Sequence, residues 1–215
     1  MKIWSLPDFP SPVLVIDEFL PPAAAWDVLG ECLSLRPVYM PARVGQGQEN
    51  RVDDRLRRND VVYLDSVFSP APDRSVILRT MKGAIWSQEA KQIWHAGDFV
   101  FDIVNYATHH ETVLSRYGTC DFYGRHQDTK HDKTDPGSIR HRLVTMVYYV
   151  NRTPEKFTGG ALTLHKNQKS LTVDPAHNRL VVFPSFTFHE VEKVTLEDDA
   201  FENGRFSLNI WLGFK

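Results

Sequence analysis

From Glu111 onward the chain carries short apolar segments that alternate with polar residues and are separated by turn-forming residues. A two-residue period of this kind is typical of β-strands that bury one face. The separators include Gly159-Gly160 and the stretch from Pro175 to Asn178, whose residue types favour tight turns. About seven strands at this spacing predict an all-β sandwich or barrel of the jelly-roll type. The predicted strands are Thr112 to Tyr117, Leu143 to Val150, Ala161 to Leu164, Leu171 to Val173, Arg179 to Phe183, Glu190 to Val194 and Phe206 to Leu212.

Residues 1–110 follow a different pattern, in which isolated strands accompany helical periodicity. We predict strands over Val13 to Ile16 and Val61 to Leu64, and a helix over Ala23 to Leu35 that follows two prolines. Between Ser75 and Tyr106, apolar residues recur at mostly helical spacing, which indicates one or two helices packed against a sheet.

The expected fold is therefore mainly β with flanking helices. Residues 111–215 would form a jelly-roll core, packed against a helical and strand support region in residues 1–110. At 42% hydrophobic and 24% charged residues, the chain is long enough to bury one good core, so we expect a single domain over residues 1–215.

The charge and the cysteines limit the possible partners and compartment. A formal net charge of −2 gives no general attraction to nucleic acid or to anionic membranes. No stretch is apolar enough to span a bilayer, and the first twenty residues lack the features of a signal peptide. Cys32 and Cys120 are too few for a disulfide scaffold and belong to no CxxC motif. We expect a soluble, cytoplasmic protein without nucleic-acid or membrane partners; the sequence leaves its oligomeric state open.

Two segments of the β half carry a pattern of metal-binding residue types. The segment Phe122-Tyr-Gly-Arg-His-Gln-Asp128 contains His126 and Asp128, and Phe183-Pro-Ser-Phe-Thr-Phe-His189 ends in His189. Two histidines and one carboxylate can bind one face of an Fe(II) ion and leave the other face for a chelating co-substrate and dioxygen. A lone His-x-Asp also occurs by chance, so the prediction depends on the whole set. The remaining histidines have no comparable partners and are expected to be surface or hydrogen-bonded residues: His95, His109, His110, His131, His141, His165 and His177.

The phase of two strands predicts a receptor for a small anion. Alternation along the last strand places Arg205, Ser207, Asn209 and Trp211 on one face, and the apolar residues between them on the other. In the same way Thr145 and Tyr149 share one face of the strand that begins at Leu143. A guanidinium group beside a phenol hydroxyl forms a good receptor for a carboxylate. We therefore predict that Arg205 and Tyr149 converge on one anion.

Taken in order, these residues resemble the Fe(II)/2-oxoglutarate-dependent dioxygenases, and within them the prolyl 4-hydroxylase-like branch. The resemblance covers roughly the last hundred residues, and residues 1–110 share only an Ile16-Asp-Glu-Phe-Leu20 opening followed by a helix. The motifs that carry it are Tyr117-Gly118, Tyr123-x-x-His126-x-Asp128, Val147-Tyr-Tyr-Val-Asn151, Gly159-Gly160-x-Leu162, Phe183-Pro-Ser185 with His189-Glu-Val191, and Arg205 followed by Trp211.

The resemblance implies a double-stranded β-helix with His126, Asp128 and His189 as iron ligands. It also implies that Arg205 and Tyr149 anchor the distal carboxylate of 2-oxoglutarate. The further residues expected around that co-substrate are Tyr117, Tyr123, Thr145 and Trp211. For both Tyr117 and Tyr123, packing inside the barrel is an equally good interpretation.

One departure from the family pattern concerns the anchor. Arg205 lies 16 positions beyond His189, further than in the family. The acidic segment between them predicts a longer hairpin rather than a lost anchor, and Lys193 is the alternative anchor.

The implied activity is hydroxylation of an unactivated C–H bond, with Fe(II), 2-oxoglutarate and O2 as cofactors and co-substrates and release of succinate and CO2. Ascorbate is a candidate reductant. The favoured substrate is a prolyl residue in a peptide or protein, and the alternative is a free amino acid or a small natural-product metabolite. Two other classes stay open: a non-catalytic metal- or ligand-binding jelly roll, and a cupin-type hydrolase or isomerase that binds Zn²⁺.

Two loops are candidates for substrate contact. Residues 41–58 are rich in glycine and charge, which predicts a mobile loop. Its arginines, Arg51, Arg55, Arg57 and Arg58, suit a lid over an acidic group or a peptide backbone. The alternative is a solvated loop in which Asp53, Asp54 and Asp60 neutralise those arginines. The second candidate is the loop from Thr129 to Ile139.

Overall fold

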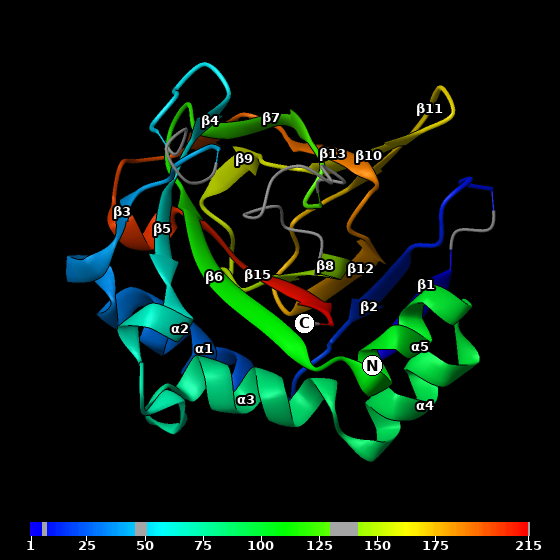
Figure 1. Ribbon diagram of the computed structural model, residues 1–215. Coiled ribbons are helices and arrows are strands. Elements are labelled where there is room, and N and C mark those ends of the chain that lie inside the picture. Colours follow the sequence, from blue (N-terminus) through cyan, green and yellow to red (C-terminus); the bar gives the residue numbers. More distant parts are fainter. Residues whose placement is uncertain (6–7, 46–50, 130–141, 215) are drawn as a thin grey trace.

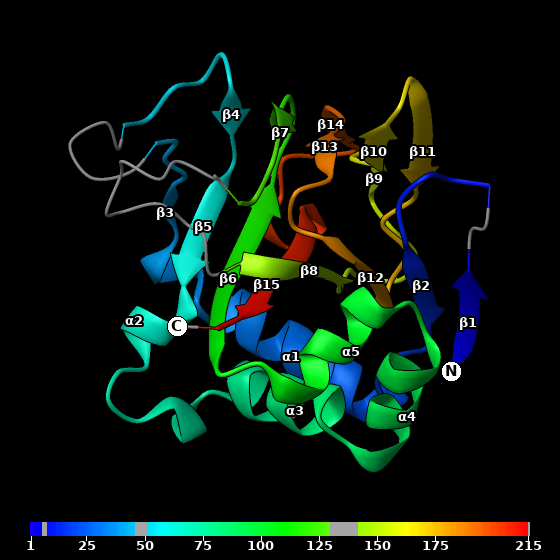
Figure 2. The ribbon, with the colours of Figure 1, turned by 45° about the vertical axis from the view of Figure 1, so that its right-hand side comes forward.

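The computed structural model describes residues 1–5, 8–45, 51–129 and 142–214. Two antiparallel sheets face each other and form the β core, and helices cover the outer side of the larger sheet (Figures 1 and 2). The larger sheet has eight strands in the order β1-β2-β12-β8-β15-β6-β5-β3. Their bounds are β1 Lys2–Ser5, β2 Leu14–Asp17, β12 Arg179–Pro184, β8 Arg142–Tyr149, β15 Arg205–Gly213, β6 His109–Tyr117, β5 Asp60–Tyr63 and β3 Met40–Pro41.

The smaller sheet has five strands in the order β11-β10-β13-β7-β4, and a further two-stranded ribbon pairs β14 with β9. After β7 the chain alternates between the sheets: β8, β12 and β15 lie in the larger one, and β10 and β13 in the smaller one. The predicted mainly β fold with a jelly-roll core is confirmed. The bounds are β11 Lys169–Val173, β10 Leu162–Lys166, β13 Phe188–Val191, β7 Phe122–His126, β4 Arg57–Arg58, β14 Val194–Leu196 and β9 Phe157–Gly159.

The helices lie in the first half of the chain, and most of them begin at a residue suited to that place. Two of them, α4 and α5, begin after Ser87 and Asp98, whose side chains accept hydrogen bonds from the backbone N–H groups of Ala90 and Val100. These two caps divide the predicted one or two helices between Ser75 and Tyr106 into three, so that prediction was wrong in number. The helices are α1 Pro22–Ser34, α2 Leu64–Val67, α3 Val76–Ile85, α4 Gln88–Ala96 and α5 Phe99–Tyr106, and short 3-10 turns cover Arg36–Val38, Pro72–Arg74 and Phe201–Asn203.

The main hydrophobic core lies between these helices and the outer face of the larger sheet. Helix residues such as Leu29, Ile77 and Trp94 pack there against Leu208 and Leu212 of β15, and all five are almost completely buried. Figure 2 shows α1, α3, α4 and α5 lying along this one side. The helices therefore stabilise the sheet from outside and leave its opposite face to the space between the two sheets.

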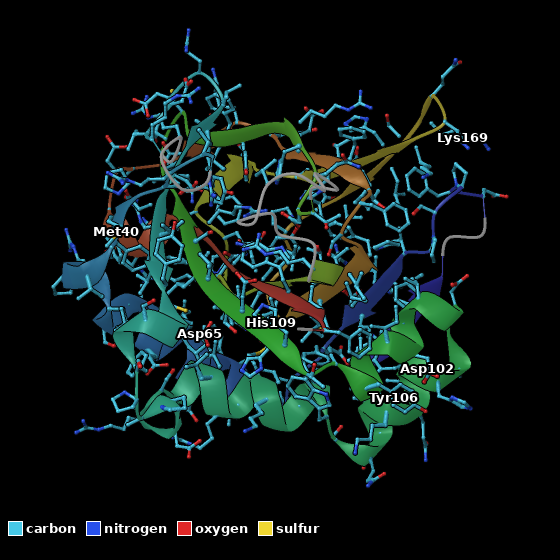
Figure 3. All side chains as sticks on the ribbon, in the orientation of Figure 1. Met40, Asp65, Asp102, Tyr106, His109 and Lys169 are labelled. Atoms are coloured by element: carbon cyan, nitrogen blue, oxygen red, sulfur yellow. The ribbon has the colours of Figure 1, made fainter. Side chains whose placement is uncertain are left out.

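Short connections tie the support region to the sheet. Asp65 of α2 accepts a hydrogen bond of 2.6 Å from the Thr112 backbone N–H of β6, and Figure 3 shows Asp65 on α2, beside the sheet. Within the described ranges, no helix has both the length and the apolar character needed to cross a membrane.

Several strands differ from the prediction. The predicted strand from Glu190 to Val194 is in fact divided, because β13 ends at Val191 and β14 begins at Val194 in a separate ribbon. β7 was not predicted, since its five residues are only partly buried and show no alternation. β1, β3, β4, β9 and α2 were also missed, because elements of two to four residues carry no periodic signal.

Candidate metal and co-substrate site

His126, Asp128 and His189 lie together between the two sheets. His126 of β7 and His189 of β13 are directly paired across the smaller sheet. The His126 Nε2 atom lies 3.6 Å from Asp128 Oδ1, and His189 Nε2 lies 3.4 Å from Asp128 Oδ2. One potential ligand atom from each residue falls within a set whose members are all within 4.8 Å of one another. Atoms that bind one ion at bond lengths of about 2.0–2.2 Å have comparable separations.

Hydrogen bonds determine which imidazole nitrogens are available. His126 Nδ1 lies 2.8 Å from the Gly124 carbonyl oxygen, and His189 Nδ1 lies 2.9 Å from the Thr187 carbonyl oxygen. A carbonyl oxygen can only accept, so each Nδ1 carries the proton and donates it. Both Nε2 atoms therefore keep a lone pair, and they lie on the side of Asp128. This is the arrangement in which backbone groups orient histidines for a metal.

Asp128 is held as a carboxylate by its neighbours. Its backbone N–H donates to the Ser185 carbonyl oxygen at 3.0 Å, and the Thr145 hydroxyl donates to Asp128 Oδ2 at 2.8 Å. Burial opposes ionisation, but the adjacent His189 and His126 outweigh it and keep the pKa of Asp128 far below its usual value. A negative ligand is thus present at neutral pH without any further change.

His189 is held in the neutral form. Burial, with the neighbouring His126 acting in the same direction, lowers the pKa of His189 to about 4. A protonated imidazole cannot bind a metal, so a neutral His189 is ready to do so at physiological pH.

The three residues line a cavity of about 540 Å³ that opens between the sheets. The cavity is bounded by the smaller sheet on one side and by the inner faces of β6, β8 and β15 on the other. Residues from both sheets line it: Tyr117, Tyr123, His126, Asp128, Arg142, Val147, Leu162, His189, Arg205, Asn209 and Trp211 are among them.

Arg205 lies deep in this cavity and is only 1% exposed. Its Nε atom donates to the Gly160 carbonyl oxygen and its Nη1 atom to the Ser207 hydroxyl, each at 3.0 Å. Among the described residues, its Nη2 atom and the hydroxyl of the fully buried Tyr149 have no hydrogen-bond partner. A buried cation with an unused donor beside an unused phenol is costly unless something binds there, and a carboxylate has the required charge and acceptors. The residues present therefore fit a 2-oxoglutarate carboxylate.

The surroundings of Arg205 are aromatic. Its guanidinium carbon lies 4.7 Å from the ring centre of Tyr117 and 4.9 Å from that of Tyr149. Burial raises the pKa of Tyr149 to about 12 although Arg205 opposes the shift, so its hydroxyl keeps its proton and can donate. Among the other predicted co-substrate residues, Trp211 and Tyr123 line the cavity.

Thr145 and Lys193 have different surroundings from the other predicted residues. The Thr145 hydroxyl contacts Asp128 and, at 2.9 Å, the Ser185 hydroxyl, so it supports a candidate ligand and is absent from the cavity wall. Lys193 is exposed and does not line the cavity either. The extra length between His189 and Arg205 contains β14 and the turn Phe201–Asn203.

The structure adds two residues to the site that no sequence pattern indicated. Glu111 and Arg142 line the cavity as an ion pair of 2.6 Å, and the Arg142 guanidinium lies 3.7 Å from the ring centre of Trp211. Glu111 belongs to β6 and Arg142 to β8, which lie on either side of β15 in the larger sheet, and the two residues are far apart in the sequence. Without strand register, no local signal connects them.

The arginines of residues 41–58 have separate surroundings. Arg51 and Arg55 both pair with the buried Asp53, in line with internal neutralisation. Arg57 and Arg58 form β4 at the edge of the smaller sheet, so the prediction of a loop is wrong at these two positions. The other predicted substrate-contact loop, from Thr129 to Ile139, lies outside the described residues except for Thr129.

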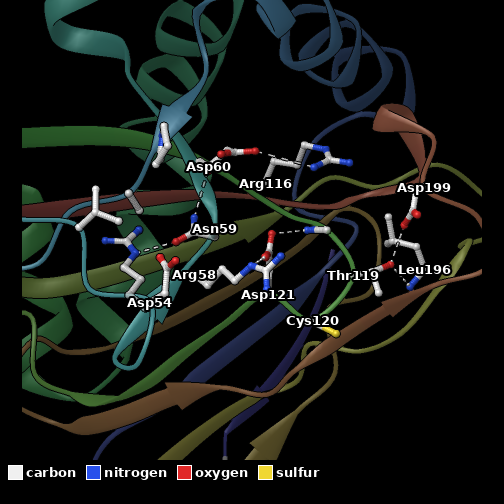
Figure 4. A pocket seen from close by; sticks show the side chains of 15 residues that line it. Asp54, Arg58, Asn59, Asp60, Arg116, Thr119, Cys120, Asp121, Leu196 and Asp199 are labelled. Carbon is white, nitrogen blue, oxygen red and sulfur yellow. Dashed lines mark hydrogen bonds and ion pairs between the residues drawn. The ribbon is translucent and has the colours of Figure 1, made fainter.

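A second cavity, of about 690 Å³, is lined by residues of β4 and β5 and by the turn from Gly118 to Asp121 (Figure 4). None of the three candidate metal ligands lines it. Two of its arginines pair with carboxylates: Arg58 Nε lies 3.1 Å from Asp121 Oδ1, and Arg116 Nη1 lies 3.9 Å from Asp60 Oδ2. Arg57 lines both cavities. Among the described residues, two buried donors without a hydrogen-bond partner, Arg205 Nη2 and Trp211 Nε1, belong to residues that line the cavity between the sheets, and none belongs to a residue that lines the second cavity.

The sequence of the β core matches a known family. The pattern of the 2OG-Fe(II) oxygenase superfamily matches residues 112–213. A PKHD-type hydroxylase from Synechocystis is 30% identical over 112 residues, which are 47% of this chain and 35% of that protein. Another, from Sphingopyxis alaskensis, is 31% identical over 83 residues, or 39% of this chain and 37% of that protein. The matches span little more than a third of the length of these relatives.

Solved structures share the fold over nearly the whole chain. A prolyl-4-hydroxylase from Pseudomonas putida has a TM-score of 0.65 at 23% identity, and the match covers 96% of this chain and 94% of that one. A prolyl hydroxylase from Trichoplax adhaerens, solved with a peptide fragment of hypoxia inducible factor, has a TM-score of 0.64 at 21% identity, covering 94% and 83%. At these identities the likeness concerns the fold. Together with the superfamily match, it supports a dioxygenase.

Proposed function

We propose that this chain, whose residues 112–213 match the 2OG-Fe(II) oxygenase superfamily, is a member of that family that hydroxylates a prolyl residue in a peptide or protein and releases succinate and CO2 from 2-oxoglutarate. Ascorbate as a reductant belongs to the same proposal. The single observation that carries it is that Arg205 lines the same cavity as the His-Asp-His cluster, while its Nη2 atom and the hydroxyl of the adjacent Tyr149 have no hydrogen-bond partner among the described residues. A structural metal site or a Zn²⁺ hydrolase has no need for a buried receptor for a carboxylate.

Each group has a distinct part in this proposal. His126, Asp128 and His189 would hold Fe(II), and Arg205 with Tyr149 would hold the distal carboxylate of 2-oxoglutarate. The bound iron and 2-oxoglutarate supply the activation of dioxygen and the cleavage of the substrate C–H bond. The protein orients both partners and keeps water away from the reacting atoms.

The choice of a prolyl substrate rests on relatives. The Pseudomonas putida and Trichoplax adhaerens structures are described as prolyl hydroxylases, and the second was solved with a peptide. The ordered motifs of this chain, from Tyr117-Gly118 to Arg205 and Trp211, resemble the same branch. A free amino acid or a small metabolite is the alternative that the assay below distinguishes.

The test has two stages. In the first, Fe(II) and then 2-oxoglutarate are added without oxygen, and the proposal predicts a weak visible charge-transfer band that a chelator removes. In the second, oxygen is admitted with proline-containing peptides, free amino acids or cell metabolites, while succinate and the gain of one oxygen atom by the substrate are measured.

The outcomes separate the classes. If peptides stimulate succinate release and are themselves oxidised to a matching extent, the proposal is supported. If only amino acids or metabolites stimulate it, the substrate is one of these compounds and not a peptidyl proline. If no band forms and no succinate appears, the chain is not a 2-oxoglutarate-dependent dioxygenase.

A further inference from the structure

The cavity between the sheets is lined by an excess of positive charge. In the described part of the chain, six arginines line it, against two carboxylates, Glu111 and Asp128. Asp128 belongs to the candidate metal site, and Glu111 is already paired with Arg142. The six arginines are Arg43, Arg51, Arg57, Arg125, Arg142 and Arg205.

Three of these arginines have no acidic partner among the residues that the structure describes. Arg205 belongs to the proposed binding site for the 2-oxoglutarate carboxylate. Arg142 pairs with Glu111, and Arg51 pairs with Asp53. Within residues 1–5, 8–45, 51–129 and 142–214, no carboxylate lies within 4.0 Å of the guanidinium groups of the other three, which are Arg43, Arg57 and Arg125. Several cations around one opening attract an anion and raise its local concentration.

Arg57 is the best placed of the three. In the register of β4 and β7 it pairs directly with Tyr123, and its guanidinium carbon lies 4.4 Å from the centre of the Tyr123 ring. That ring stacks on the imidazole of His126, with a centre-to-centre distance of 3.5 Å and an interplanar angle of 13°. The two separations together place the guanidinium carbon no further than about 8 Å from the His126 ring.

Arg57 is held in place while part of its guanidinium stays available. Its Nε atom donates to Asn59 Oδ1 at 2.7 Å, and its backbone N–H donates to the Asp53 carbonyl oxygen at 3.0 Å. The adjacent Gly124 N–H donates to the Leu56 carbonyl oxygen at 2.8 Å, which fixes β4 against β7. The Nη atoms of Arg57 have no carboxylate partner in the described parts of the chain. An arginine restrained in this way is preorganised for a bidentate contact with a carboxylate.

We propose that Arg57 recognises a carboxylate of the substrate, so that this site selects acidic substrates. The inference rests on the proposed function and names the chemical class on which it acts. Because an extended chain advances by about 3.3–3.6 Å per residue, two to three residues span the distance from Arg57 to the His126 ring, so we expect the carboxylate close to the reacting residue in the sequence of a peptide. Two sources offer this chemistry: an acidic residue beside the proline of a peptide, and the carboxylate of a free amino acid. Arg125, whose guanidinium carbon lies 4.9 Å from the ring centre of Phe188, adds to the positive rim.

The primary test measures binding to the protein loaded with Fe(II) and 2-oxoglutarate in the absence of oxygen. The probes are two proline peptides with a neutral fluorescent label, one with glutamate on both sides of the proline and one with glutamine. We expect about 10-fold tighter binding of the glutamate peptide at low ionic strength, and a smaller ratio as salt rises. A second pair, L-proline and L-prolinamide as competitors, tests the free amino acid as the source.

Arg57→Met is the test variant and Arg58→Met its matched control. The two residues are neighbours on β4, but Arg58 pairs with Asp121 in the second cavity, where Figure 4 shows it. Arg57→Met should reduce the preference for the carboxylate to less than about 2-fold, Arg57→Lys should restore part of it, and Arg58→Met should leave it unchanged.

Each outcome decides the question. Equal affinity of the wild type for both members of each pair, no binding of either, or the same loss in Arg58→Met would overturn the proposal. A normal charge-transfer band in Arg57→Met shows that the iron site is intact. If that band is lost, Arg125→Met takes its place and must itself weaken the preference. Absence of the band from the wild type would instead refute the proposed function, so the two failures are distinguishable.

Discussion

The two faces of β15 differ in chemistry although they belong to the same nine residues. Phe206, Leu208, Ile210 and Leu212 face the helices and are part of the main hydrophobic core. The residues between them face the other way: Arg205, Asn209 and Trp211 line the cavity, and Ser207 accepts a hydrogen bond from Arg205.

The two faces differ less in burial than in whether their polar atoms have hydrogen-bond partners. Arg205 is as deeply buried as Leu208, but its Nη2 atom has no partner, and Trp211 Nε1 is in the same state among the described residues. The outer face is complete without any ligand. The polar atoms of the inner face obtain all their hydrogen-bond partners only when a polar ligand binds. This need for a ligand distinguishes a binding surface from a purely structural one. The following predictions test this distinction.

The largest effect is expected on activity, for a substitution in the cavity between the sheets. Asp128→Ala should reduce succinate formation to the background rate, because the variant lacks the negative ligand of the proposed iron site. Succinate is measured by mass spectrometry with excess Fe(II), and circular dichroism serves as a control for folding. Retention of a substantial part of the activity would show that Asp128 is no metal ligand.

On the outer face the large effect should be on stability. Leu208→Ala removes a fully buried side chain from the main core and should lower the free energy of unfolding by about 2–5 kcal/mol. Its neighbour on the inner face, Asn209, donates one hydrogen bond of 2.9 Å to the Ser115 hydroxyl, so Asn209→Ala should cost only about 1 kcal/mol. Urea unfolding of the metal-free protein measures both. Equal losses would contradict the comparison.

Arg205→Met should separate binding from stability. Loss of a charge-assisted contact of about 1.5–3 kcal/mol predicts 2-oxoglutarate binding that is weaker by about 10- to 100-fold, while Fe(II) binding is unchanged. The variant should lose less stability than Leu208→Ala, because the arginine it replaces has an unpaired buried donor. Titration of the charge-transfer band gives the affinity. Unchanged affinity would exclude Arg205 as the anchor.

The smallest effect is expected for Tyr149→Phe. The variant lacks the phenol hydroxyl, a neutral donor at the same carboxylate site. The affinity for 2-oxoglutarate should therefore fall by less than about 10-fold, in line with about 0.5–1.5 kcal/mol for a neutral hydrogen bond. The same titration measures it, and Tyr148→Phe is the matched control. The Tyr148 hydroxyl is directed to Asn178 in the outer core, at 2.9 Å. An effect larger than that of Arg205→Met would reverse the proposed roles.

Much of the β core was predictable because alternation and motif order are local properties of the chain. The family resemblance drawn from residues 117–211 is confirmed by the superfamily match over residues 112–213. The helices were underestimated in number, since Ser87 and Asp98 interrupt a pattern that looks continuous in hydrophobicity alone. The roles of His126, Asp128 and His189 as iron ligands stay a prediction, although their ligand atoms lie within reach of one ion.

By itself, the sequence determined which residues of each strand share a face, because side chains alternate along any β-strand regardless of its neighbours. It therefore placed Arg205 and Trp211 on the face opposite to Phe206 and Leu208. Only the tertiary structure decided which strands lie side by side. The pairing of β4 with β7 brings Arg57 over Tyr123 and Tyr123 over His126, across almost seventy residues of chain. Such a contact depends on strand register between distant segments, and no local pattern encodes that register.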